Sequence, residues 1–348
     1  MKRAILTVLL IPVLASAASR AGALDIFFID VEGGGSTLVV TPAGQSLLID
    51  AGYGGRGGRD SARILAAAAD AGIDRIDYLL ITHFHNDHVG GVPELASSIP
   101  IGTFIDYGAP LGTDRMANGG FRAYEPVRGE NPHIQPRPGD RLPLDGIEAE
   151  IVSAGGMLLS APLGGGGRTN DACVNVEDQP EDGTENFRSI GVMLQLGSFR
   201  FLHLGDLSGN TLTKLACPIN LLGEATVYLV AHHGDYDTNV PALYAALRPR
   251  VAIMNNGVTK GGSPDAFKTL HAQPELEDLW QLHASRNPRV TNAPEALIAN
   301  VDDETTGYAI RLTALADGSF RIVNGRTAFT KTYPPLLPSQ DQTIPDIR

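Results

Sequence analysis

The stretch "ITHFHNDHVGG", residues 81–91, holds three of the chain's nine histidines and one aspartate within six positions. It follows an apolar run that we predict to be a buried strand, so these side chains begin where that strand ends. His83 and His85 would project to one side of an extended segment, while Asp87 and His88 follow in a predicted turn. Imidazoles and carboxylates are side chains that hold Zn²⁺. The stretch therefore predicts a metal site at a strand end, with one pair of ligands for each of two adjacent ions.

Two later motifs place further metal-ligand side chains directly after apolar runs. The motif "HLGD" ends in Asp206, and "AHHGD" contains His232 and His233. Four side chains are too few for two ions, so we expect these later residues to complete the site, with the Asp206 carboxylate as a bridge between the ions. The alternatives are that Asp206 caps a helix and that one of the two histidines is structural.

In this order, the motifs "HFHNDHVGG", "HLGD" and "AHHGD" resemble those of the metallo-β-lactamase superfamily. The opening "FFIDVEGGGSTLVV…LLIDAGYG" is similar to the branch that contains the metallo-hydrolase domain of competence (DNA-uptake) proteins and the phosphorylcholine esterases. The resemblance covers roughly residues 24–325. It implies an α/β fold, a four-layer αβ/βα sandwich of two mixed β-sheets, with a dinuclear site at the edge that the sheets share.

The resemblance also implies roles for single residues. His83 and His85 would bind the first metal, and Asp87 and His88 the second. Asp206 would bridge the two metals. A motif histidine would complete the second metal position, and we expect His232 rather than His233 because His232 follows the predicted strand directly. Asp50 would hold the first-motif loop by hydrogen bonds rather than bind metal.

One departure from the superfamily pattern concerns the first metal. Many members supply it with another histidine from an intervening loop, and Asn186 stands at that position here. The histidines of that interval are His133, which we predict to lie in a loop, and His203, which we predict to be buried and structural. Asn186, His203 and His233 stay open as further ligands or as partners of ligands. With only three protein ligands, the first metal would keep open positions for water and substrate.

The predicted function is hydrolysis by a hydroxide that two metal ions generate at neutral pH, with Asp87 and Asp206 as the carboxylates that catalysis requires. Zn²⁺ is the expected metal, with Mn²⁺ or iron as alternatives. The branch favours a phosphodiester or phosphoester; an ester, lactone or lactam is the alternative. An iron-dependent, sulfur dioxygenase-like oxidoreductase and a non-catalytic metal-binding protein represent other classes. Candidate substrate contacts, each with a solvated surface role as the alternative, are Arg168, Asn170, Lys260 and His271.

The first 23 residues are typical of a cleaved secretory signal: a basic start, an apolar run of about eleven residues, and small residues at the cleavage positions. We therefore expect a periplasmic or secreted protein that leaves the membrane after cleavage. The net charge of −12, or −15 without the three basic residues of this segment, argues against nucleic-acid partners and favours a small-molecule substrate. In an oxidising compartment, Cys173 and Cys217 form either one disulfide or two free thiols. The sequence does not indicate an oligomeric state.

The remainder of the chain is predicted as one domain over residues 24–333, followed by a Pro-rich polar tail over 334–348. Short apolar runs separated by Gly and Pro alternate with helical segments, and hairpins are predicted over 189–206 and 307–325. The Gly-, Pro- and Asn-rich segment 109–140 is predicted to be irregular.

Overall fold

The structure, a computed structural model, describes residues 22–176, 178–179, 182–301 and 306–336. The predicted signal segment lies almost entirely outside the described residues, as does most of the predicted tail from residue 334. Within the described part of the chain, every helix is too short or too polar to cross a bilayer.

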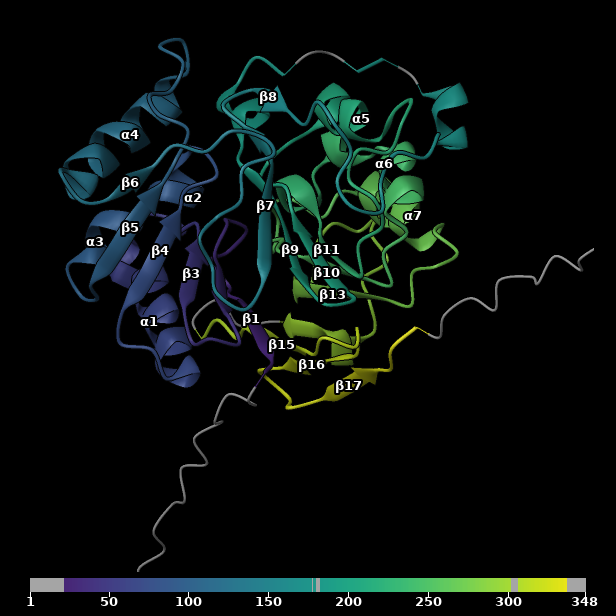
Figure 1. Cartoon of the computed structure of the whole chain (residues 1–348). Helices are drawn as coiled ribbons and strands as arrows, with labels where there is room; N and C mark the ends of the chain where they lie inside the picture. The colour runs from purple at the N-terminus through teal and green to yellow at the C-terminus, as the bar shows by residue number, and fades with distance from the viewer. Residues whose placement is uncertain (1–21, 177, 180–181, 302–305, 337–348) are drawn as a thin grey trace, which may run out of the picture.

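Two mixed β-sheets form the centre of the molecule (Figure 1). The first sheet has nine strands in the order β17-β16-β15-β1-β2-β3-β4-β5-β6. In chain order these are β1 (Leu24–Phe28), β2 (Thr37–Val40), β3 (Ser46–Ile49), β4 (Ile76–Leu80), β5 (Ile101–Ile105), β6 (His133–Ile134), β15 (Ile310–Ala314), β16 (Phe320–Asn324) and β17 (Thr330–Tyr333). The second sheet has eight strands in the order β14-β13-β12-β11-β10-β9-β7-β8. They are β7 (Glu148–Ala154), β8 (Met157–Leu158), β9 (Gly191–Leu196), β10 (Phe199–His203), β11 (Val227–Leu229), β12 (Val251–Met254), β13 (Asp278–His283) and β14 (Ile298–Asn300).

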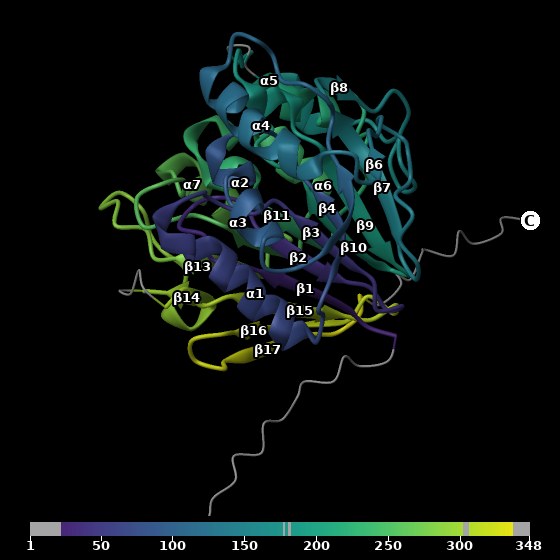
Figure 2. The ribbon, with the colours of Figure 1, turned by 90° about the vertical axis from the view of Figure 1, so that its left-hand side faces the viewer.

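Helices cover the outer faces of both sheets, which confirms the predicted four-layer sandwich (Figures 1 and 2). The first sheet carries α1 (Arg59–Ala71), α2 (Asn86–Val89), α3 (Val92–Ala96) and α4 (Arg115–Arg128). The second carries α5 (Gly209–Ala216), α6 (Pro241–Leu247) and α7 (Pro264–His271). Short 3₁₀ helices complete the list: η1 (Arg56–Gly58), η2 (Asp171–Asn175), η3 (Glu185–Arg188), η4 (Ala231–Gly234), η5 (Tyr236–Thr238) and η6 (Glu295–Leu297).

The alternation of side chains along β10 shows how the layers pack. Phe201 belongs to the core between the sheets, where its ring centroid lies 5.7 Å from that of Phe28 in the first sheet. The next residue, Leu202, belongs to a second core that includes Leu212 of α5 and Leu243 of α6. A strand with both faces buried must be apolar on both, which is why the strands of this sheet appear in the sequence as continuous apolar runs.

The irregular structure predicted for residues 109–140 is wrong, because α4 occupies the middle of this segment. The side chain of Asp114 caps the helix by accepting hydrogen bonds from the backbone N–H groups of Met116 and Ala117. Gly120 is needed for packing, since a Cβ there would lie 2.2 Å from the carbonyl oxygen of Phe84. Tertiary contacts of this kind outweigh the low helix propensity of the local sequence.

The carboxyl ends of strands from both sheets meet where the first-motif loop lies. In the first sheet, β3 and β4 run parallel, and Asp50 and His83 follow them. In the second, β10 and β11 run parallel, and Asp206 and the two histidines at 232–233 follow them. Side chains more than 100 residues apart in the sequence are therefore brought to one edge of the sandwich.

A buried charge network joins the two sheets below this edge. Asp30, which follows β1, accepts a hydrogen bond from Arg63 of α1 at 2.8 Å and lies 2.7 Å from Nε2 of His283, the last residue of β13. Glu32 also lies 2.9 Å from Arg63 and 3.4 Å from His283. A single guanidinium and one imidazole thus face both carboxylates, and the network ties the first sheet to the second.

Cys173 and Cys217 form a disulfide, which links η2 to the residue that follows α5. The bond therefore holds the long segment before η3 against the helical layer of the second sheet.

A Cys173→Ser/Cys217→Ser double variant is expected to have a free energy of unfolding about 2–4 kcal/mol lower than the wild type, because its unfolded chain is less restricted. Urea unfolding followed by the fluorescence of the single tryptophan, Trp280, measures the difference. Reductant should destabilise the wild type and leave the double variant unchanged; equal sensitivity of the two proteins would contradict the prediction.

Candidate metal centre

The first-motif loop is buried where it leaves β4. His83, His85 and His88 are each at most 8% exposed. The predicted turn is a short helix, α2, which contains Asp87 and His88 and has His85 as its N-terminal cap residue. Gly35 gives this helix room, because a Cβ there would lie 2.6 Å from Nδ1 of His88.

Four histidines converge on one carboxylate oxygen. The Oδ2 atom of Asp206 lies 3.1 Å from Nε2 of His88 and 3.3 Å from Nε2 of His233. It also lies 3.7 Å from Nε2 of His83 and 3.8 Å from Nε2 of His232. Because these residues come from both sheets, the Asp206 carboxylate stands at the centre of the site, as a bridge between two ions would.

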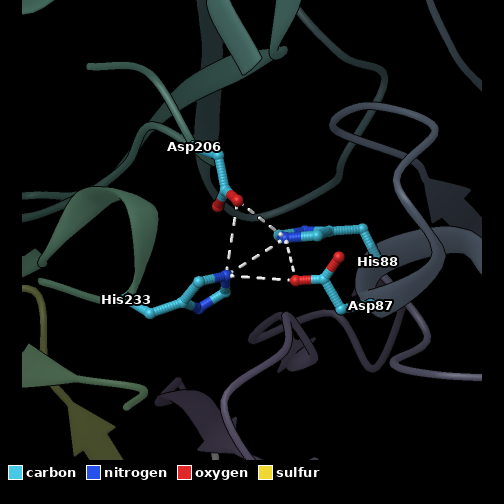
Figure 3. A group of neighbouring side chains, drawn as sticks. All are labelled: Asp87, His88, Asp206 and His233. Carbon is cyan, nitrogen blue, oxygen red and sulfur yellow. Dashed lines mark hydrogen bonds and ion pairs between the residues drawn. The ribbon is translucent and has the colours of Figure 1, made fainter. Parts of the chain in front are cut away.

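Asp87 joins three of these residues in a group that could surround one ion. Its Oδ2 lies 3.4 Å from Nε2 of His88 and 3.5 Å from Nε2 of His233. One ligand atom from each of Asp87, His88, Asp206 and His233 lies within 4.8 Å of all the others. The four side chains point toward one another (Figure 3).

His233, rather than the expected His232, is the motif histidine that lies in this group, and the assignment of either to a metal stays a prediction. Strand β11 already ends at Leu229, so neither histidine directly continues the strand. The order of the two histidines therefore does not decide which side chain enters the group. Both histidines have left-handed backbone conformations, with φ of 44° and 55°. This turn directs the His233 ring to Asp87 and leaves His232 beside Asp206 on another side.

Carboxylates outside the centre hold the second nitrogen of three motif histidines. Asp50 lies 2.7 Å from Nδ1 of His88, and also accepts hydrogen bonds from the backbone N–H and the hydroxyl of Thr82. Asp114 lies 2.9 Å from Nε2 of His85. Asp237 lies 2.8 Å from Nδ1 of His232. Such partners set the tautomer and orientation of metal-binding imidazoles.

Sequence reasoning missed two of these partners. Asp114 lies in the segment predicted to be irregular, and its position before a helix is visible only once α4 is known. Asp237 lies five residues after His232, a spacing that could have marked it as a candidate.

The residues fit a metal ion in their chemistry. The Nε2 atom of His83 is buried and has no hydrogen-bond partner among the described residues, which is costly unless something else binds it. Burial and the neighbouring His88 hold the pKa of His83 well below its usual value, so its ring is neutral, as a ligand must be. Although burial opposes it, the charges of His233 and His88 hold the pKa of Asp206 well below its usual value, so it remains a carboxylate.

The other two candidate ligands lie at the margin of the centre. Asn186, on η3, places Nδ2 3.4 Å from Nε2 of His232. His203 is buried at the end of β10, and its Nδ1 accepts a hydrogen bond from the backbone N–H of Gly205. Burial lowers the pKa of His203 to about 4, so this residue is a neutral support for the loop that carries Asp206.

Of the four candidate substrate contacts, Lys260 reaches the metal centre. Its ammonium group donates a hydrogen bond to Oδ2 of Asp87 and lies 3.3 Å from the hydroxyl of Tyr53. A cavity of about 550 Å³ begins at Lys260. Its polar lining includes Tyr236, Thr259, Asn287 and Arg289.

Arg168 and Asn170 lie away from the candidate centre, and a role for them in substrate binding stays a prediction. Both line a cavity with Arg200 and Arg250, at the amino ends of β10 and β12, whereas Asp206 follows the carboxyl end of β10. The amide of Asn170 is also committed, since it donates to the carbonyl oxygens of Ala216 and Ala242.

His271 is exposed on the last turn of α7. Its ring lies beside that of Phe267, with 6.2 Å between the ring centroids. The structure therefore gives His271 no place at the centre.

Comparisons with known proteins agree with this architecture. Residues 30–172 match the family model described as the Metallo-beta-lactamase superfamily. A segment of 85 residues is 33% identical to a hydroxyacylglutathione hydrolase of Stenotrophomonas maltophilia, covering 24% of this chain and 30% of that protein. The chain thus spans less than a third of the length of this curated relative.

Solved structures resemble the fold at low sequence identity. The metallo-beta-lactamase fold protein YhfI from Bacillus subtilis is 10% identical, with a TM-score of 0.44 over 83% of this chain and 98% of that one. Igni18, a metallo hydrolase from Ignicoccus hospitalis, is 13% identical, with a TM-score of 0.43 over the same shares. The particular branch of the superfamily stays a prediction.

Proposed function

We propose that this chain, which carries a metallo-beta-lactamase superfamily domain, is an exported, metal-dependent hydrolase of small phosphodiesters or phosphoesters. The convergence of four imidazole nitrogens on one oxygen of Asp206, beside Asp87, is the observation that carries the proposal. The predicted Zn²⁺, with Mn²⁺ or iron as alternatives, would lower the pKa of a water to about 7 when bound and would polarise a phosphoryl oxygen.

The chain's own residues supply the ligands and their orientation. The second position would be held by Asp87, His88, Asp206 and His233, and the first by His83, His85 and Asp206. Asp50 and Asp114 orient two of the imidazoles by binding their other nitrogens. Since Asp87 and Asp206 both keep pKa values well below the usual range, they present charged oxygen atoms at neutral pH.

Lys260 supports an anionic substrate. Its positive charge lies at the edge of the centre, and the adjoining cavity of about 550 Å³ has the size of a small-molecule site. Gly261, the next residue, is packed so closely that a Cβ would lie 2.2 Å from the carbonyl oxygen of His233. The loop that contains Lys260 and Gly261 therefore lines the cavity and also borders the metal centre. A phosphate group could contact Lys260 and the metal centre together. The net charge of −12 favours a small substrate over a polynucleotide.

A carboxylic ester, lactone or lactam is the second candidate substrate. The segment shared with a protein named hydroxyacylglutathione hydrolase favours it. The same residues would serve, with the carbonyl oxygen in place of a phosphoryl oxygen.

The test is a panel of chromogenic substrates applied to zinc-loaded protein and to chelator-treated protein. We expect zinc-dependent hydrolysis of a bis-aryl phosphate, without hydrolysis of a lactone or a nitrocefin-type lactam. The reverse preference would support the second candidate. Bound iron with oxygen uptake would indicate an oxidoreductase, and two bound ions without any turnover would indicate a binding protein.

Replacing Lys260 should weaken the use of anionic substrates. A charge-assisted hydrogen bond contributes about 1.5–3 kcal/mol, so Lys260→Ala is expected to lower kcat/KM for a phosphodiester by roughly 10- to 100-fold, mainly through KM. The matched control is Lys268→Ala, which removes an exposed ammonium group from α7. An equal effect of the two variants on kcat/KM would contradict the role of Lys260.

A further inference from the structure

We propose that the two adjacent histidines are divided between the metal positions, with His233 at the second and His232 at the first as a third imidazole ligand. This inference rests on the dinuclear centre of the proposed function. It changes the composition of the first position, for which His83, His85 and Asp206 are the residues that the sequence predicts.

The position of the His232 ring is the first argument. Its Nε2 lies 3.8 Å from Oδ2 of Asp206, nearly the same separation as the 3.7 Å of His83. Both rings stand outside the compact group that would hold the second ion. His232 therefore approaches the bridging carboxylate as His83 does, and a cation at the first position would need ligands of this kind.

The second argument is the way His232 is held. Its Nδ1 lies 2.8 Å and 3.0 Å from the two carboxylate oxygens of Asp237, so Nδ1 carries a proton and, when the ring is neutral, Nε2 presents its lone pair to the centre. His88 and His85 are held by Asp50 and Asp114 in the same manner. This is the arrangement of a metal-binding imidazole with its outer carboxylate.

A hydrogen bond from Asn186 explains the position of the His232 Nε2 atom less well than a metal ion would. The Nδ2 atom of Asn186 lies 3.4 Å away, beyond the roughly 2.7–3.2 Å that is typical of N–H···O hydrogen bonds in proteins. The amide is close enough to border the first position but leaves the nitrogen weakly bonded.

The backbone of η4 is the third argument. His232 and His233 are consecutive non-glycine residues with positive φ, a conformation that costs of the order of 1–3 kcal/mol at each residue. The backbone N–H of His232 donates to the carbonyl oxygen of Gly205, next to Asp206, at 3.0 Å. The strained turn thus places two successive rings around the loop of the bridging carboxylate, which a regular extension of β11 could not do, because successive strand side chains alternate between faces.

The test measures metal content and metal position, not turnover. Wild-type protein, His232→Ala and Asp237→Asn are loaded with Co²⁺ or Zn²⁺ and dialysed, and bound metal is counted by elemental analysis. We expect two ions in the wild type and one in His232→Ala, with the first-position affinity falling by roughly 10- to 100-fold in Asp237→Asn. His133→Ala, which removes an imidazole that pairs with Asp106 instead, should keep both ions.

A crystal structure of the zinc-loaded wild type, with anomalous maps, covers the case in which a variant does not fold. An ion about 2.0–2.1 Å from Nε2 of His232 would support the inference. Two ions, neither of them bound to His232, would overturn this inference alone, as would unchanged affinity for both ions in His232→Ala. A wild type that binds no metal would overturn the proposed function together with it.

Discussion

If the proposed dinuclear centre forms, an Asp206→Ala variant is expected to lose its metal ions and to lose activity on the panel substrate by at least roughly 10³-fold. The oxygen that this change removes lies within 3.8 Å of four imidazole nitrogens, and no other carboxylate is as central among the described residues. Metal ions provide several kcal/mol of charge stabilisation in the transition state, and each 1.36 kcal/mol or so corresponds to a factor of ten in rate. Elemental analysis after dialysis and the substrate panel measure the two losses.

Two further variants give this experiment its controls. Asp206→Asn keeps the volume of the side chain but has no negative charge, so it should also lose metal, which separates charge from packing. Asp70→Ala removes an exposed carboxylate from α1 and should behave as the wild type. Full metal content and full turnover in a folded Asp206→Ala protein would show that the centre is assigned to the wrong residue.

An Asp30→Ala variant is expected to lower the free energy of unfolding by about 3–5 kcal/mol, the usual consequence of leaving a buried charge without its partner. Asp30 is 0% exposed and bonds Arg63 from α1 and His283 from the second sheet. Without it, Glu32 still faces Arg63 at 2.9 Å, but the shortest contact of His283 with the first sheet, 2.7 Å, is replaced by one of 3.4 Å to Glu32. Urea unfolding monitored by Trp280 fluorescence measures the change.

A double-mutant cycle with His283→Ala separates the interaction between Asp30 and His283 from a general loss of stability. If the pair acts as described, the two single costs will not add in the double variant, because the second change removes a partner that is already lost. Additivity within about 0.5 kcal/mol would show that Asp30 and His283 act independently. Asp74→Ala, an exposed aspartate in the loop before β4, is the matched control.

The regular strands and several helices could be predicted because their signals are local. The apolar runs with Gly and Pro between them indicated β1 to β5, and the Gly197-Ser198 turn indicated the hairpin in which Leu196 pairs with Phe199. Ser263 followed by Pro264 indicated the start of α7, and the Ser263 side chain does accept a hydrogen bond from the N–H of Ala266. Helix α4 was missed because Gly119, Gly120 and Pro126 are typical of loops, while its stability comes from contacts with distant residues.

The metal-ligand chemistry of the candidate site was also local, but its partners were not. Three histidines and an aspartate at a strand end could be recognised without any fold. Asp114 and Asp237 could not, since an aspartate becomes an orienting partner only where the fold places it beside an imidazole. Arg168 and Asn170 show a related limit of local signals: a polar loop residue in the sequence does not reveal at which end of a sheet it lies.

The sequence by itself predicted the layered α/β architecture and the ligand types of the candidate centre, because side-chain periodicity and ligand type are properties of short segments. Only the tertiary structure decided which residues meet. Whether His232 or His233 enters the group with Asp87 depends on the backbone angles of these two residues and on the carboxylate of Asp206, which lies in the turn after β10. Neighbours in sequence share almost the same local signal, so only long-range packing can tell them apart.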